Sequence, residues 1–380
     1  MTHITGERLL APTPSIHDRA PARTGRPDRR RAGRGAAAAA GAAAAAVLAL
    51  VSQPARADHP AAVFGTGLGG PAWTLTADTL PQGRWGASLL NEYRRFDAPD
   101  RSALAVQAAR AGGHAHGLRS LWSPSLAVAY GLSDRLTLLA RLPYVRRTDL
   151  SEGHVHGNGS TGTHALGDSA GLGDLLVGGH WRVWDNGRGA SAALSFGSFA
   201  PTGVTDRRSS EGERFTAEHQ PGTGAWRPFL GAVYSQRAGR LGLHTYLRLT
   251  RPFEGTQSTR LGERVDYGAA LVLPLGGAAA AAPHDHGAGV PAHHHHHDDA
   301  PGVQWSALVE LNGEYLRPQR IAGAVEGQRE HALFLAPGVR VSGPGGWSAA
   351  LSVGRPVHQR VGPEHVRTDW RALASIGAAF

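Results

Sequence analysis

Apolar and polar residues alternate with a period of two over most of this chain, in segments of about ten residues. The clearest segment is 303–316, VQWSALVELNGEYL, in which one face is almost entirely apolar and the other carries Gln, Ser, Glu and Asn residues. The same alternation occurs in 240–250, 264–275 and 368–380. Because successive side chains of a β-strand point to opposite faces, this pattern predicts an all-β protein.

The two faces of these segments require different surroundings. A soluble β-sandwich would turn the charged face to water, whereas a transmembrane barrel turns the apolar face to lipid and the charges to its lumen. The segments have the length that a tilted strand needs to span a bilayer. Aromatic residues such as Trp85, Tyr130 and Trp305 lie at segment ends, and the chain ends in Phe380, which resembles the C-terminal aromatic signature of outer-membrane barrels. We therefore expect a transmembrane antiparallel up-and-down β-barrel, with the sandwich as the alternative.

About twelve strands are predicted, an even number as in single-chain bacterial barrels. A further pair could lie in 72–80 or 201–225, so that ten to fourteen strands remain open. Tight turns alternate with longer connections, and outer-membrane barrels keep the tight turns on the periplasmic side. The predicted strands are 84–94, 121–131, 135–145, 172–184, 189–199, 226–236, 240–250, 264–274, 303–316, 331–342, 346–356 and 368–380.

The N-terminal residues 1–57 are predicted to be a signal peptide. A basic stretch, RPDRRRAGR at 26–34, precedes an Ala-rich apolar stretch and an Ala-x-Ala cleavage site at 55–57. A disordered Ala-rich tail is the alternative. We expect a periplasmic N-terminal segment at 58–83, followed by the outer-membrane barrel at 84–380.

The charge and the absence of cysteine exclude several classes of function. The formal net charge is +9, but nine Arg against three acidic residues in 1–57 supply six of these charges. The remainder is only weakly basic, so no nucleic-acid partner is expected. Without Cys there is no disulfide scaffold, no Cys-based zinc site and no thiol nucleophile. The expected location is the outer membrane of a Gram-negative bacterium, where the partners are lipid, the barrel assembly machinery, and small solutes or metal ions.

Short motifs carry a family resemblance over about residues 70–380. The motifs are YGLSDRL at 130–136 followed by LPYV at 142–145, GLGDL at 171–175 followed by HWR at 180–182, PTG at 201–203, and GP at 70–71 followed by TADTLPQG at 76–83. They resemble those of the family named for the meta-pathway of phenol degradation, which implies an outer-membrane transporter barrel. The family name implies phenolic or other hydrophobic cargo. The chain departs from the family pattern in 275–302. The alternation of connections predicts a tight turn at this place, but the connection is long and rich in His, and we expect it in the periplasm.

The parity of each strand predicts which ionisable side chains face the lumen. They are either a polar core whose ion pairs stabilise a nearly closed barrel, or a constriction that selects small polar or amphipathic solutes. Asp174 is expected to point inward beside His180 and Arg182, or to hold a loop at the rim. The predicted lumen residues are Glu92, Arg141, Asp174, His180, Arg182, His244, Arg248, Arg264, Asp266, Glu310, Glu314, Arg340, Asp369 and Arg371.

Histidines form three groups that could bind transition metals. Two His residues at positions i and i+2 of an extended chain project to the same side, and imidazole suits Zn, Cu and Ni. No cofactor is required, but Zn, Cu or Ni binding is expected at these segments, or solvated low-complexity sequence as the alternative. The candidate ligands are His114 and His116, then His154 and His156 with His164 nearby, and finally His284, His286, His293, His294, His295, His296 and His297 in 275–302.

Three classes of function follow, of which the third is a purely structural or adhesive barrel. The first is an outer-membrane channel or transporter for small solutes, and its alternative is a barrel that binds or passes transition metals through the His-rich loops. The second is an enzyme barrel, which would need a Ser, a His and an orienting Asn or Asp at one level. The chain has no G-x-S-x-G motif and no Ser–His pair that stands out, so no catalytic residues and no enzymatic activity are expected.

Overall fold

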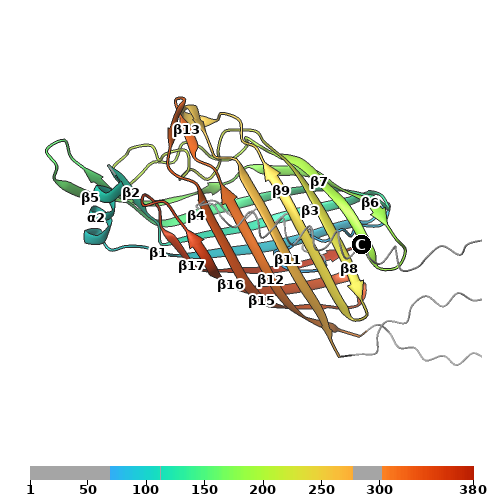
Figure 1. Ribbon diagram of the computed structural model, residues 1–380. Helices are drawn as coiled ribbons and strands as arrows, with labels where there is room; N and C mark the ends of the chain where they lie inside the picture. Colours follow the sequence, from blue (N-terminus) through green and yellow to red (C-terminus); the bar gives the residue numbers. More distant parts are fainter. Residues whose placement is uncertain (1–68, 112, 277–301) are drawn as a thin grey trace, which may run out of the picture. The chain divides into compact units, whose positions relative to one another are not determined.

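Twelve antiparallel strands form the wall of a barrel in the computed structural model, which describes residues 69–111, 113–276 and 302–380 (Figure 1). All twelve predicted strands are confirmed, and the soluble sandwich is wrong. The wall strands are β1 (Trp85–Asp97), β3 (Ser120–Ser133), β4 (Leu136–Val155), β6 (Leu175–Asp185), β7 (Ala190–Ala200), β8 (Arg227–Ala238), β9 (Leu241–Thr250), β11 (Arg264–Leu275), β12 (Gln304–Leu316), β15 (Glu330–Ser342), β16 (Trp347–Arg360) and β17 (Arg367–Ala379).

The sheet closes on itself. β1 pairs with β17 near the two ends of the barrel domain, with Gly86 opposite Ala379 and Arg94 opposite Arg371. β4 pairs with β3 on one side and with β6 on the other, which completes the ring. Closure leaves no unpaired wall edge, as a strand structure surrounded by lipid requires.

The two ends of the barrel differ. At the tight-turn end, β3–β4, β6–β7, β8–β9 and β15–β16 are joined by short turns. At the long-loop end, the connections include residues 98–119, 201–226 and 361–366. This alternation agrees with the predicted lengths and follows from the antiparallel order, because every second connection returns to the same end.

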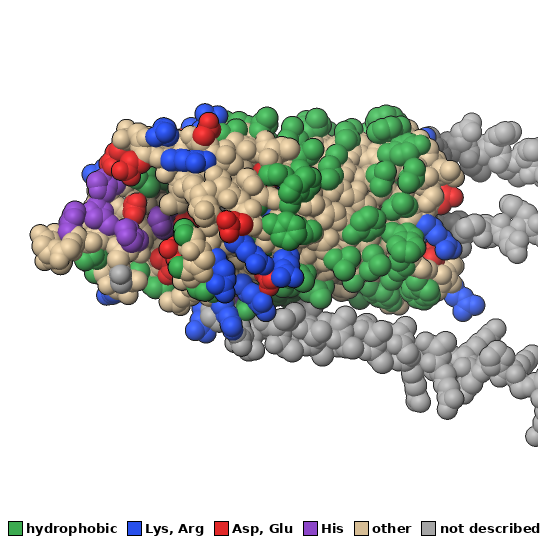
Figure 2. All heavy atoms as spheres, turned by 90° about the horizontal axis from the view of Figure 1, so that it is seen from above, with side chains coloured by type: hydrophobic (Ala, Val, Ile, Leu, Met, Phe, Trp, Pro, Cys, Tyr) green, Lys and Arg blue, Asp and Glu red, His purple; other side chains and the backbone are tan. Residues whose placement is uncertain are grey.

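The outer surface of the wall is apolar. Leu89, Leu230 and Ile376 are 59%, 60% and 56% exposed, although they lie within wall strands. Figure 2 shows hydrophobic side chains in a band over the wall, whereas charged side chains lie towards both ends and His side chains gather at one end. Trp85 and Trp305 are also exposed, close to the tight-turn end. Removing so much apolar surface from water is strongly favourable, and lipid supplies that environment.

Several short elements lie at the long-loop end, where the sequence predicted only loops. Helix α2 (Arg101–Ala111) packs against β2 (His114–Gly117) through a cluster of Leu104, Ala108 and Ala115. β5 (Thr161–Leu172) pairs with residues 144–155 of β4. We call β2 and residues 149–167, which are the ends of β4 and β5 and the turn between them, the arm. The long-loop end also carries β10 (Thr259–Arg260), β13 (Gln319–Ile321), β14 (Ala324–Glu326) and the 3-10 turn η2 (Thr256–Ser258). A second 3-10 turn, η3 (Pro344–Gly346), instead joins β15 to β16 at the tight-turn end. The helix of the described chain is too short to cross a membrane.

Candidate functional site

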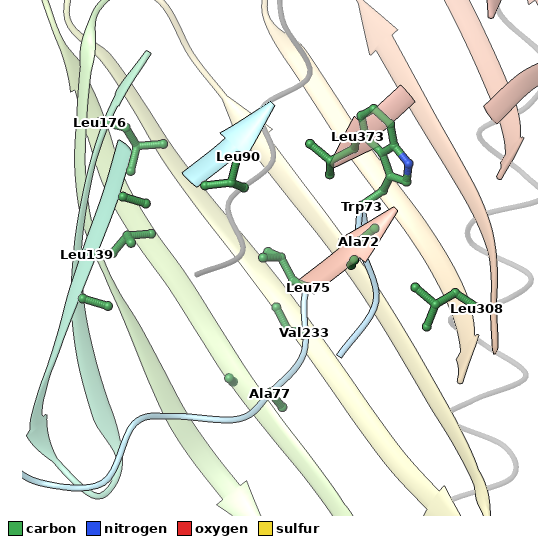
Figure 3. Close-up of a cluster of buried hydrophobic side chains, with 14 of the residues drawn as sticks. Ala72, Trp73, Leu75, Ala77, Leu90, Leu139, Leu176, Val233, Leu308 and Leu373 are labelled. Carbon is green, nitrogen blue, oxygen red and sulfur yellow. The ribbon is translucent and has the colours of Figure 1, made fainter. Parts of the chain in front are cut away.

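The lumen of the barrel is occupied by residues 69–83, which we call the plug segment. Trp73, Leu75 and Ala77 are buried at 4%, 5% and 0% exposure in one cluster with wall residues such as Leu90 and Leu373. Figure 3 shows the segment running between the walls with these side chains inside. The sequence predicted a periplasmic position for 58–83, and residues 69–83 instead run within the barrel. The physical reason is that their apolar side chains bury against the apolar residues of the lumen wall.

One carboxylate holds the innermost part of the plug segment. Glu310 of β12 accepts hydrogen bonds from the backbone N–H groups of Ala72 at 2.8 Å, Trp73 at 2.9 Å and Thr74 at 2.8 Å. The side-chain amide of Asn312 donates to the Thr74 hydroxyl at 2.9 Å. Hydrogen bonds to an ionised carboxylate are stronger than neutral ones, so Glu310 is the main polar attachment of the plug segment.

Wall hydroxyl groups hold the rest of the segment towards the tight-turn end. The Ala77 N–H donates to the Ser235 hydroxyl and the Leu80 N–H donates to the Thr137 hydroxyl, both at 2.8 Å. At the rim, the Gln82 N–H donates to the Asp134 carboxylate at 2.9 Å. The plug segment therefore satisfies these N–H groups with wall side chains and not with a strand ladder.

A row of ion pairs crosses the lumen next to the plug segment. Glu314 of β12 accepts from Arg94 of β1 at 2.8 Å and from Arg264 of β11 at 2.7 Å. Asp266 accepts from Arg264 and from Arg248 of β9, both at 2.7 Å. Three wall strands separate β1 from β12, so the Arg94–Glu314 pair spans the interior. Breaking such a buried pair by removing one partner costs about 3–5 kcal/mol, and these side chains fill the lumen at this level.

Arg371 of β17 lies between two aromatic rings. Its guanidinium carbon is 4.1 Å from the ring centroid of Trp73 and 3.9 Å from that of Phe334 on β15. The Nε and Nη2 atoms have no hydrogen-bond partner among the described residues. The site therefore combines a flat cation–π surface with unused donors, and one of its two walls belongs to the plug segment.

The loop 201–226 covers the long-loop end and is tied down by Asp174. This carboxylate lies between β5 and β6 and accepts from the Gly203 N–H at 3.0 Å, from the Thr223 hydroxyl at 2.6 Å and from Arg227 at 3.3 Å. Of the two predicted positions for Asp174, the loop-holding one is therefore observed. A cavity of about 70 Å³ remains below the loop. Its lining includes Arg141, Arg147, Asp174, Phe199, Arg227 and Arg264.

His219 joins this loop to two others. Its ring centroid is 4.9 Å from that of His116 on β2, which in turn is 6.1 Å from that of His365. Arg147 donates to the His219 carbonyl at 3.4 Å, and Glu218 lies 3.8 Å from His116. Burial, and then the neighbouring His116, lower the pKa of His219 to about 3. The junction therefore excludes water and holds a neutral imidazole.

The structure brings most of the predicted lumen residues together inside the barrel. Arg248, Asp266, Glu310 and Glu314 form the contacts described above, and Arg141 donates to Ser125 at 2.9 Å. Arg340 donates to the Ser348 hydroxyl at 2.8 Å, and His244 bonds to the Ser235 hydroxyl at 2.8 Å. His180 is buried, whereas Arg182 lies at the tight-turn end and donates to the Asp134 carbonyl at 2.8 Å.

The predicted metal ligands are only partly described. His114, His116, His154 and His156 lie on the arm, and His116 also packs in the loop junction. His284, His286 and His293 to His297 fall outside the described residues. Within residues 69–111, 113–276 and 302–380, no three His, Asp or Glu side chains already converge on a point that could hold a metal ion.

Sequence reasoning missed Trp73 and Thr74 as functional residues. A signal was present, because Trp73, Leu75 and Ala77 share the period of two, and 72–80 was considered as a further strand. The pattern does not distinguish a strand in the wall from an extended segment inside it. Only the contacts with Glu310 and Arg371, far away in the sequence, decide between these positions.

Comparison with known proteins supports the fold. No family model and no curated relative matches the chain. The crystal structure of an outer membrane channel from Pseudomonas putida F1 matches with a TM-score of 0.50 and 16% identity, over 80% of this chain and 98% of that one. A FadL homologue from Pseudomonas aeruginosa (TM-score 0.34, 10% identity, 87% of this chain and 98% of that one) and the toluene transporter TbuX from Ralstonia pickettii (0.36, 9%, 84% and 95%) are more distant. The fold is that of an outer-membrane barrel, and its apolar outer wall places it in the outer membrane of a Gram-negative bacterium.

Proposed function

We propose that this protein is an outer-membrane channel for small solutes and that the plug segment keeps its lumen closed. The observation that carries the proposal is the attachment of the plug segment to Glu310. Three consecutive backbone N–H groups bind one wall carboxylate, but the segment adds no strand to the wall ladder. A segment held by side chains can leave while the barrel stays folded.

The lumen favours planar solutes that carry a polar or anionic group. Arg371 already contacts two aromatic rings, one from Phe334 and one from Trp73 of the plug segment. An aromatic solute that takes the place of Trp73 would keep the cation–π contact, and its hydroxyl or carboxylate could accept from the unused donors of Arg371. This supports the cargo implied by the resemblance to the phenol-degradation family, which is part of the proposal.

The proposal includes the orientation of the barrel in the outer membrane. The tight-turn end faces the periplasm and the long loops face outside, as in other outer-membrane barrels. The plug segment then runs from Ala72 inside the lumen to Gln82 at the periplasmic rim. β11 ends and β12 begins on that same side, and the His-rich residues 277–301 between them fall outside the described residues.

Neither catalysis nor metal passage is part of the proposal. The polar contacts described in the lumen are structural, and we assign no catalytic residue. Passage of metal cations is the alternative drawn from the sequence.

Single-channel recording in planar bilayers tests the proposal. The mature wild-type barrel is expected to show low conductance with rare openings, and a variant lacking residues 70–80 is expected to show a stable conductance at least severalfold higher. A deletion of the same length in 277–301 is the matched control and should leave the conductance unchanged. An equally closed barrel after removal of 70–80 would refute the role of the plug segment.

The cargo is tested by adding the solute to the open variant. Phenol or benzoate at millimolar concentration should produce transient blockades in the variant lacking 70–80. The blockades should disappear in the same background when Arg371 is replaced by Met. Blockades that do not depend on Arg371 would contradict the proposed cargo site but not the channel itself.

A further inference from the structure

The two faces of the arm have different compositions. β4 pairs with β2 on one side and with β5 on the other, with His114 and Gly162 both opposite His154. The small residues Ala115 and Gly153 face helix α2, and a Cβ at Gly153 would lie 2.6 Å from the Leu104 carbonyl oxygen. The alternate residues therefore project from the opposite face, where they form a His-rich surface.

His154 and His156 point their ring nitrogens at each other. The distance between the two Nε2 atoms is 3.2 Å, and the ring planes are at 89°. Two imidazole nitrogens that bind one tetrahedral Zn²⁺ at about 2.0–2.1 Å lie about 3.3 Å apart. The spacing of this pair is therefore already that of two ligands of a single ion.

Gly162 leaves room beside this pair. A Cβ at this position would lie 2.6 Å from the Nε2 atom of His154 and 2.9 Å from that of His156. The glycine therefore leaves open a point that both nitrogens face. No backbone conformation special to glycine is involved, so the missing side chain is what matters at this position.

A third imidazole lies against the pair, and carboxylates orient two rings of the surface. The ring of His164 stacks on that of His154 with centroids 4.7 Å apart. The Nδ1 atom of His164 bonds to Glu211 at 2.7 Å, and the Nδ1 atom of His114 bonds to Glu152 at 2.8 Å. A carboxylate on Nδ1 fixes the tautomer whose Nε2 lone pair is available, which is the usual second partner of a metal-binding His.

We propose that the arm carries a transition-metal site in which His154 and His156 are the first two ligands and His164 is the third. A rotation of the His164 ring brings its Nε2 atom to the ion, and water completes the coordination. The site fits Zn²⁺ or Cu²⁺, the ions that imidazole prefers. It binds an ion at the long-loop end, independently of the channel proposed above, and requires no passage of metal through the lumen.

Calorimetric titration with ZnCl₂ in detergent at pH 7.5 tests the site. The titrated protein is the full mature chain with His284, His286 and His293 to His297 replaced by Asn, which removes the competing tract. One equivalent of Zn²⁺ should bind. Replacing Glu211 by Gln should weaken binding about tenfold, because loss of a carboxylate partner of a metal ligand typically has that effect.

Substitutions on the arm give the decisive comparison. Gly162→Ala keeps all three imidazoles but fills the point between them, so the affinity should fall at least tenfold. The matched control is Gly157→Ala in the same hairpin, where a Cβ would meet nothing within 4 Å and binding should not change. The double variant H154N/H156N should lose binding. A full equivalent of Zn²⁺ bound by that variant, or none bound by the parent protein, would overturn the proposal.

Discussion

The plug segment and the arm are both additions to the barrel wall, but their backbones are hydrogen-bonded in different ways. The plug segment lies in the lumen and bonds its backbone N–H groups to side chains of the wall, with Glu310 as the central acceptor. The arm projects at the long-loop end and bonds its backbone in a strand ladder that continues β4. The plug segment depends on the barrel, whereas the arm is supported by its own pairing.

This difference determines what each region can do. A segment without a ladder is held by a few strong contacts, so the loss of one contact can release it. A ladder holds its side chains at fixed spacings, which suits a binding surface such as that of His154 and His156. The lumen is thus suited to opening and closing, and the arm to recognition.

The largest expected effect comes from Glu310→Ala. This change removes the acceptor of three N–H groups, and a hydrogen bond to a charged group contributes about 1.5–3 kcal/mol. We expect the open probability in planar bilayers to rise about 100-fold. The exposed Glu326→Ala in β14 is the control. A Glu310→Ala channel that is as closed as the wild type would mean that the apolar contacts alone hold the plug segment.

Trp73→Ala should have the next largest effect. It removes the ring that covers Arg371, and a desolvated cation–π contact contributes about 2 kcal/mol. The open probability should rise about 30-fold, while the thermal stability of the wall stays unchanged. Trp226→Ala on the exposed outer surface should leave gating as it is. If both Trp variants gate alike, the Arg371 contact is not part of the closure.

Acidification should loosen the loop junction at the long-loop end. The folded-state pKa of His219 is about 3, which is below the value of about 6.5 for an unfolded chain. The unfolded or opened state therefore binds the proton first, so the stabilisation is complete above pH 6.5 and is lost as the pH falls towards 3. At pH 5 the loss is about 2 kcal/mol.

Protease cleavage within the loop 201–226 measures this loss. Cleavage should be faster at pH 5 than at pH 7.5, after correction for protease activity. The titratable or charged side chains that face His219 are those of His116, His365, Glu218 and Arg147. His219→Gln should remove most of the pH dependence, and an unchanged dependence would assign it to His116 or His365.

The smallest effect is expected on the arm. His154→Asn replaces a partly exposed side chain on a self-supporting ladder, so the free energy of unfolding should change by no more than about 0.5 kcal/mol. Thermal unfolding in detergent and channel gating should both match the wild type. A change of gating in this variant would show that the arm and the plug segment are coupled, contrary to the distinction drawn here.

The sequence predicted the wall well because each strand carries its own signal. The alternation in 303–316 or 264–275 marks the lipid face of a strand without reference to any other strand. The same alternation predicted that Glu310, Glu314 and Asp266 face the lumen, because they lie on the polar face of their strands. The strand β2 of the arm and the helix α2 beside it were missed because β2 has only four residues and α2 has no clear apolar periodicity.

The sequence by itself determined the all-β class, the positions of the wall strands and the residues that face inward, because a period of two is a local property of the chain. Only the tertiary structure decided which inward residues meet. Glu310 and Thr74 are 236 positions apart, and Arg94 and Glu314 are 220 apart. Closure of the ring brings them together, so the plug segment and the ion pairs are consequences of barrel geometry and have no local signature.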